Sequence, residues 1–148
     1  MQDRDEVMTV NLRSVFFLSQ TTTRQMLAQG GGGSIINIAS MLSFQGGIRI
    51  ASYTASKSGV AGLTRLLANE WAARGIHVNA IAPGYFVTDN TRALREDAAR
   101  SREILSRIPA GRWGEPRELV GAAMFLASPA AVCVHGAIIP VDGGWLAR

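Results

Sequence analysis

The sequence predicts an α/β fold with a parallel sheet, and three observations support this prediction. Segments whose apolar residues recur at helical spacing alternate with short apolar runs, in the order helix, strand, helix, strand, helix, strand. The short runs are rich in isoleucine and valine, as in strands buried on both faces. A length of 148 residues and a hydrophobic content of 47% suit one globular domain with its own core.

The first half of the chain is expected to form a helix, a strand and a second helix. Helical spacing predicts the first helix over residues 4–29, and four glycines at 30–33 end it. Those glycines are not a dinucleotide fingerprint, because they follow a helix and precede a strand. The run 34–39 predicts a strand, a loop follows over residues 39–52, and a second helix is expected over residues 53–73.

The second half continues the alternation. Residues 76–82 predict a strand, and the polar, arginine-rich segment 88–110 predicts short helices. A further helix is expected over residues 115–127, with a proline in its first turn. The run 137–141 predicts the last strand, in which Pro140 should lie at an end or on an edge.

Composition argues against several classes of function. The net charge of +4 comes from bases spread along the chain, whereas a nucleic-acid footprint would be concentrated. No apolar stretch is long enough for a membrane span, and the polar N-terminus does not resemble a signal peptide, so we expect a cytoplasmic protein. The single cysteine, Cys133, excludes an internal disulfide and a multi-cysteine metal site, and we expect no metal. Neither H-E-x-x-H nor G-x-S-x-G occurs, which disfavours a metalloprotease or a serine hydrolase.

The segment Tyr53-Thr54-Ala55-Ser56-Lys57 is the most informative motif. A tyrosine and a lysine four residues apart lie on one face of a helix, and a nearby ammonium favours the phenolate form of the tyrosine. Such a tyrosine can exchange a proton with a carbonyl or alcohol oxygen. Lys57 is also the only lysine in a chain that otherwise uses arginine, which indicates a task that arginine cannot perform.

Other residues are expected to converge on this pair. Ser40 follows the strand 34–39 and precedes Tyr53 by 13 positions, and the strand 76–82 runs into Pro83-Gly84. Open α/β sheets bind ligands at the carboxyl ends of their strands. If the strands are parallel, these residues share one rim.

Together with these residues, the segments NIAS, YTASK, VNAIAPG and VDGG resemble the short-chain dehydrogenase/reductase family in order and spacing. The resemblance covers nearly all of the chain. It implies that residues 1–148 form the C-terminal portion of a Rossmann-like, doubly wound parallel sheet, the catalytic half of a dinucleotide-binding domain. Further stretches resemble a subgroup that acts on deoxy keto sugar acids of the gluconate type.

The resemblance implies a role for each catalytic candidate. Tyr53 would be the general acid/base, and Lys57 would promote its ionisation and hold the nicotinamide ribose. Ser40 would bind the reacting oxygen of the substrate, and Asn11 would hold a water that extends the proton relay. Besides Tyr53 and Lys57, the implied contacts to the cofactor, NAD with NADP not excluded, come from Pro83, Gly84, Phe86 and Thr88.

The resemblance also places a substrate lid over residues 88–112, where one or two arginines could bind the carboxylate of a sugar acid. The candidates are Arg92, Arg95, Arg100, Arg102, Arg107 and Arg112. For most of them we expect solvated helix faces with acidic partners. The whole protein would be a homotetramer without a nucleic-acid or membrane partner.

Taken singly, the same residues have structural interpretations. Asn11 could be an ordinary helix residue, Ser40 a turn residue, and Thr88 a helix cap. Asp142-Gly143-Gly144 is expected to be a turn near a subunit interface, with Trp145 and Leu146 buried between subunits.

A complete member of the family begins with a strand, a glycine-rich phosphate loop and a helix, and no T-G-x-x-x-G-x-G pattern occurs in this sequence. We therefore expect on the order of 100 further residues upstream in a full-length protein. Two hypotheses stay open: the chain is the catalytic part of a dehydrogenase, or it is a non-catalytic remnant that serves only in structure or oligomerisation.

Overall fold

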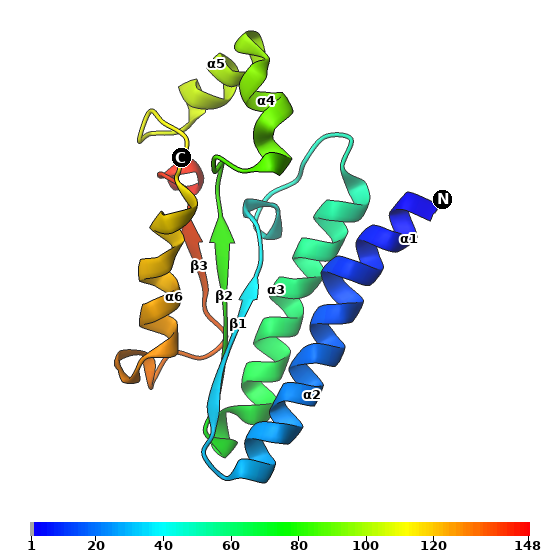
Figure 1. Ribbon diagram of the computed structural model, residues 1–148, viewed down its shortest axis with the longest axis vertical. Coiled ribbons are helices and arrows are strands. Elements are labelled where there is room, and N and C mark those ends of the chain that lie inside the picture. Colours follow the sequence, from blue (N-terminus) through cyan, green and yellow to red (C-terminus); the bar gives the residue numbers. More distant parts are fainter. Residues whose placement is uncertain (1) are drawn as a thin grey trace.

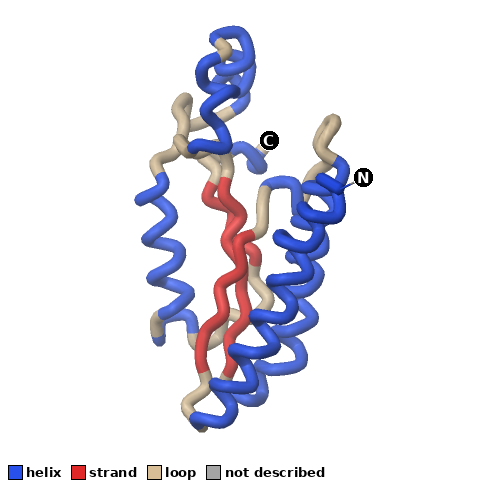
Figure 2. Tube along the Cα trace, turned by 45° about the vertical axis from the view of Figure 1, so that its right-hand side comes forward, coloured by secondary structure: helices blue, strands red, loops and turns tan. Residues whose placement is uncertain are grey.

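The computed structural model of the protein describes residues 2–148 and has three layers (Figures 1 and 2). A parallel sheet of three strands, in the order β1-β2-β3, lies in the middle. The N-terminal helices and α3 cover one face of the sheet, and α6 covers the other. The predicted α/β architecture with a parallel sheet is therefore confirmed.

The first predicted helix is continuous, although its middle is not α-helical. It consists of α1 (Gln2–Met8), a π-helical turn (Thr9–Arg13) and α2 (Ser14–Gln29). Ser14, the first residue of α2, donates from its hydroxyl to the carbonyl oxygen of Val10 in the turn. A π turn inserted in an α-helix is rare and is frequently found at functional sites.

The three strands match the predicted runs to within a residue at most ends. β1 (Gly33–Ile38) pairs with β2 (Ile76–Pro83), and β2 pairs with β3 (Ile138–Val141). Within residues 2–148, β3 pairs on one side only, so Pro140 lies on an edge as predicted.

The helix α3 (Ala51–Trp71) begins two residues earlier than predicted and therefore places Tyr53 in its first turn. A 3-10 turn (Ala72–Arg74) continues α3, and Gly75 ends it in the left-handed region at φ +74°. The central core lies between α3 and β2, where Leu67 and Val78 are fully buried.

After β2 the chain forms the segment in which a substrate lid is predicted, residues 88–112, which we call the lid region, and then returns to the sheet. The 3-10 turn Asp89–Thr91, α4 (Arg92–Glu96) and α5 (Ala98–Arg107) extend above the carboxyl ends of the strands (Figure 1). The expected helix 115–127 begins as a 3-10 turn (Pro116–Leu119) before α6 (Val120–Ala127). No helix within residues 2–148 combines the length and the apolar character needed to cross a bilayer.

The C-terminal turn (Trp145–Ala147) differs from the expectation for Trp145. Trp145 is buried within its own chain, against Met41, Ile104 and Ile108, rather than exposed for a subunit contact. Its large ring fills the gap between the sheet rim and the lid, so this burial requires no partner.

Candidate active site

The predicted convergence of the motifs at one rim is confirmed. β1 and β2 are parallel, with Ile38 opposite Ile81, so Ser40 and Pro83 both leave the sheet at its carboxyl edge. The first turn of α3, which carries Tyr53, lies next to this edge (Figure 1).

Lys57 is anchored to the end of β1. Its Nζ donates a 2.7 Å hydrogen bond to the carbonyl oxygen of Ile38 and lies 5.8 Å from the ring centroid of Tyr53. Burial lowers the pKa of Lys57, because desolvation disfavours the ammonium form. Tyr53 itself is 37% exposed, so a ligand can reach the phenol.

Ser40 is buried and begins a short 3-10 turn (Met41–Ser43). Its hydroxyl oxygen accepts a 3.2 Å hydrogen bond from the Leu42 amide. Ser43, which the motif analysis did not single out, donates from its hydroxyl to the carbonyl oxygen of Lys57 at 2.7 Å. The turn after β1 is thereby tied to the turn of α3 that bears the lysine.

Asn11 lies in the π-helical turn and reaches α3. Its amide nitrogen donates to the hydroxyl of Ser56 at 3.4 Å, and Ser56 donates to the carbonyl oxygen of Tyr53 at 2.8 Å. Ser56 is fully buried, and sequence analysis missed this role; its place between Tyr53 and Lys57 was the available signal.

The segment after β2 turns closely against the C-terminal strand. A Cβ added at Gly84 would lie 2.6 Å from the Cα of Asp142, so a side chain at this position would displace backbone. Phe86 is buried, while Thr88 is exposed and caps the 3-10 turn that follows it. Both interpretations of Thr88, as a cap and as a residue that faces ligand, remain compatible with this position.

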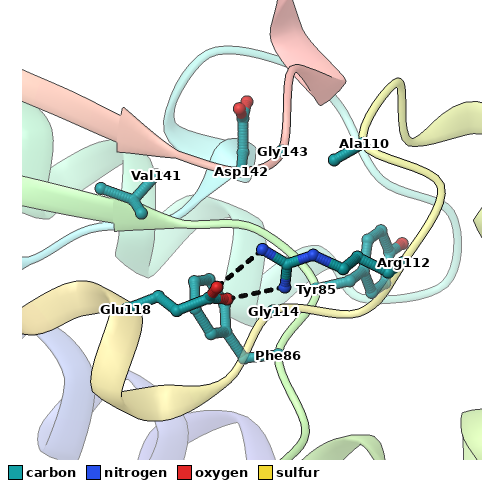
Figure 3. Close-up of a pocket in the computed structure, with 9 residues that line it drawn as sticks. All are labelled: Tyr85, Phe86, Ala110, Arg112, Gly114, Glu118, Val141, Asp142 and Gly143. Carbon is teal, nitrogen blue, oxygen red and sulfur yellow. Dashed lines mark hydrogen bonds and ion pairs between the residues drawn. The ribbon is translucent and has the colours of Figure 1, made fainter.

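A cavity of about 210 Å³ lies behind this segment (Figure 3). Across it, Arg112 forms a bidentate pair with Glu118, at 2.6 and 2.9 Å. Hydrogen bonding to Arg112 holds the pKa of Glu118 at about 2. The cavity is lined by Tyr85, Phe86, Ala110, Arg112, Gly114, Glu118, Val141, Asp142 and Gly143.

Three of the six lid-region arginines, namely Arg92, Arg100 and Arg112, have acidic partners, whereas most of the six were expected to have them. Arg92 pairs with Asp89, and Arg100 pairs with Glu103. Arg95 donates to the carbonyl oxygen of Thr88 at 3.2 Å. Because of these contacts, fewer guanidinium groups are available to bind a substrate carboxylate than the number of arginines in this segment suggests.

The donors at the rim fit the nicotinamide ribose half of a dinucleotide. Lys57 uses one of its three N–H donors on Ile38, and no acidic residue within residues 2–148 pairs with it, so two donors remain for ribose hydroxyls. The sequence contains no G-x-G-x-x-G turn that would hold a pyrophosphate.

A parallel sheet between two helix layers, with a serine, a tyrosine and a lysine at its carboxyl rim, defines an α/β protein of the dinucleotide-binding class. A family model described as "Enoyl-(Acyl carrier protein) reductase" matches residues 1–146. The chain belongs to this group, the short-chain dehydrogenase/reductase family.

Individual relatives carry gluconate-related names. The chain is 68% identical to a 2-dehydro-3-deoxy-D-gluconate 5-dehydrogenase of Dickeya dadantii over 97% of its own length and 57% of that protein. A protein of the same name from Escherichia coli is 65% identical over 99% of this chain and 58% of its own length. The chain thus spans somewhat more than half the length of these relatives.

Two solved structures resemble this one closely. A candidate 2-deoxy-D-gluconate 3-dehydrogenase of Agrobacterium tumefaciens with bound NADP has a TM-score of 0.98 and 66% identity, covering all of this chain and 60% of its own. A gluconate 5-dehydrogenase of Burkholderia cenocepacia in complex with NADP and tartrate has a TM-score of 0.96 and 46% identity, covering 99% of this chain and 57% of its own. The described layers therefore correspond to part of a Rossmann-type domain.

Proposed function

We propose that this chain supplies the catalytic portion of a nicotinamide-dinucleotide-dependent oxidoreductase that interconverts a secondary alcohol and a ketone. The observation that carries the proposal is the hydrogen bond from Lys57 to Ile38, which holds a single half-buried ammonium 5.8 Å from the ring of Tyr53. Lys57 is the only lysine in a chain with 14 arginines, and it is anchored beside the phenol of Tyr53. This arrangement suits a role in proton transfer better than a role as a solvated surface charge.

Tyr53 is proposed to act as the general acid/base. In alcohol oxidation, its phenolate oxygen would take the hydroxyl proton while a hydride leaves the carbon that bears the hydroxyl. In ketone reduction, a hydride would add to the carbonyl carbon while the phenol gives its proton to the carbonyl oxygen. The Lys57 ammonium lies beside the phenol ring, and the Ser40 hydroxyl would orient the reacting oxygen. Asn11 would hold a water beyond Lys57 through which the proton reaches solvent.

The cofactor supplies the hydride acceptor or donor when it is bound. Tyr53 and Lys57 would contact its ribose, and Pro83, Gly84, Phe86 and Thr88 would line its nicotinamide. We propose NAD as the cofactor with NADP as the alternative, since bound NADP in two similar structures supports a nicotinamide dinucleotide of either kind.

The proposed substrate is a deoxy keto sugar acid of the gluconate type or the corresponding hydroxy acid. The gluconate-related names of the relatives support this class, and the tartrate bound in one similar structure is itself a hydroxy acid.

We also propose that the protein is cytoplasmic and forms a homotetramer. The free, exposed thiol of Cys133 is consistent with a reducing compartment. Exposed Phe17 and Leu18 on α2 and Met124 on α6 would suit subunit contacts.

The test uses a fusion in which the N-terminal portion of the Dickeya dadantii relative, up to its matching region, precedes this chain. We expect the fusion to oxidise or reduce gluconate-type acids with NAD(H) or NADP(H), and to prefer them to simple ketones. A folded fusion that binds dinucleotide and yet turns over none of these acids would contradict the proposal. Such a result would favour the alternative of a non-catalytic module.

A further inference from the structure

A hydrogen bond joins the C-terminal turn to the loop between Ser40 and Tyr53. Trp145 donates from its indole Nε1 to the side-chain oxygen of Gln45 at 3.3 Å, across 100 positions of sequence. Gln45 lies in the segment 41–50, which we name the linking loop because it joins Ser40 to α3. Trp145 is 5% exposed, so the donor has little access to water as a substitute partner.

The same indole contacts the lid. The guanidinium carbon of Arg107, the last residue of α5, lies 4.1 Å from the Trp145 ring centroid. The ring also packs with Ile104 and Ile108 at the end of the lid and with Met41, the residue that follows Ser40. One side chain therefore contacts both the lid and the beginning of the linking loop.

The turn that presents Trp145 is itself well fixed. The two carboxylate oxygens of Asp142 accept 2.9 Å hydrogen bonds from the amides of Gly144 and Leu146. Gly144 adopts φ +89°, a conformation that L side chains rarely adopt. At the C-terminus, the Arg148 guanidinium donates to the carbonyl oxygen of Ser106 in α5 at 2.7 Å. The indole is thus presented from a backbone with little freedom.

We propose that Trp145 is a positioning residue: it holds the linking loop through Gln45 and couples that loop to the lid through Arg107. The consequence for turnover rests on the proposed function, since the loop begins next to Ser40 and ends at the helix of Tyr53. If the lid closes on a substrate, its movement would be transmitted to the linking loop through the Trp145 ring.

The first test measures hydrogen exchange in the 148-residue chain and in the fusion, and it requires no activity. The reporters are the amides of Phe44 and Gln45, which both donate to the carbonyl oxygen of Met41. Trp145→Phe keeps an aromatic ring and removes the indole donor, and Gln45→Leu removes the acceptor. We expect Trp145→Phe to speed exchange at both reporters about fivefold, and Gln45→Leu to do the same at Phe44, the effect of one neutral hydrogen bond.

Trp113→Phe is the matched control. Trp113 packs edge-on against Tyr85 in the same cluster, but within residues 2–148 its indole nitrogen makes no hydrogen bond. If Trp113→Phe speeds exchange in the linking loop as much as Trp145→Phe does, general packing explains the effect and the proposal is overturned. Unchanged exchange in both Trp145→Phe and Gln45→Leu overturns it as well.

The second test is kinetic and uses the fusion. We expect Trp145→Phe and Gln45→Leu each to lower kcat about fivefold with unchanged dinucleotide affinity, and the double variant to lose no more than either single one, because both remove the same bond. Additive losses would overturn the coupling. If the fusion variants show the expected change in exchange but the fusion has no turnover, the positioning role is supported and the proposed function is refuted. If the Trp145→Phe fusion is fully active and its exchange is unchanged, the proposed function is supported and the positioning role is refuted.

Discussion

The Lys57 ammonium is bound to the carbonyl oxygen of Ile38, the last residue of β1, at 2.7 Å. The bond fixes the lysine from α3 to the rim of the sheet, where the strands end. It also leaves the ammonium half-buried, which lowers the pKa of Lys57. The position and the pKa of the Lys57 ammonium therefore both depend on its reach to the Ile38 carbonyl oxygen.

Replacing Lys57 by arginine should damage the site although the charge is kept. A planar guanidinium cannot occupy the position of a compact ammonium between the Ile38 carbonyl and the Tyr53 ring. In the fusion, we expect Lys57→Arg to lower kcat/KM about a hundredfold, within the range of acid–base contributions. Arg65→Lys, at an exposed position of the same helix, is the control and should change little. Wild-type kinetics in Lys57→Arg would refute the assigned role.

The lowered pKa of Lys57 also predicts how stability depends on pH. The folded chain binds this proton less tightly than the unfolded chain does, so the charged lysine costs stability below the folded pKa. That cost disappears as the pH rises through the folded pKa toward the ordinary lysine value. We therefore expect Lys57→Met to gain its largest stability advantage near neutral pH and to lose it in alkali. Urea unfolding at pH 7 and in alkali measures this, and a pH-independent difference would contradict it.

Tyr53→Phe should remove turnover and spare the fold. The ring is partly exposed and, within residues 2–148, its hydroxyl makes no protein hydrogen bond, so deleting the oxygen should leave thermal unfolding unchanged. We expect a loss of about a hundredfold or more in kcat for the fusion. Tyr85→Phe, the same change at the other tyrosine, should retain activity. A fully active Tyr53→Phe enzyme would exclude the phenol as the acid/base.

The success and failure of the sequence predictions have identifiable causes. The strands and α3 were predictable because Ile, Val and Leu recur at the strand and helix periods, and the pairing of Tyr53 with Lys57 follows from helix geometry alone. The π turn at Asn11 and the serine contacts to α3 were not, because they arise from packing between distant elements. The burial of Trp145 within its own chain was not predictable either, because an aromatic residue in a sequence does not reveal which residues bury it.

Asn79 illustrates such a long-range contact and yields a stability prediction. It is 1% exposed in β2, donates to the carbonyl oxygen of Val134 at 2.8 Å and accepts from the amide of Ala137 at 2.9 Å. Asn79→Ala leaves two backbone groups unpaired and should cost about 2–4 kcal/mol in the free energy of unfolding. Asn90→Ala, at an exposed position, is the control. Equal stability of the two variants in urea would mean that Asn79 is dispensable.

The 148-residue chain on its own should bind a dinucleotide weakly. We propose that Lys57 holds the nicotinamide ribose and that the turn after β2 lines the nicotinamide, but the sequence has no G-x-G-x-x-G turn to place backbone amides on a pyrophosphate. Losing hydrogen bonds to a charged group should weaken affinity at least about a hundredfold relative to the fusion. Calorimetric titration with NAD and NADP measures both proteins, with nicotinamide riboside, which carries no phosphate, as the control ligand. We expect the riboside to bind the chain and the fusion alike, and equal dinucleotide affinity in both proteins would contradict the prediction.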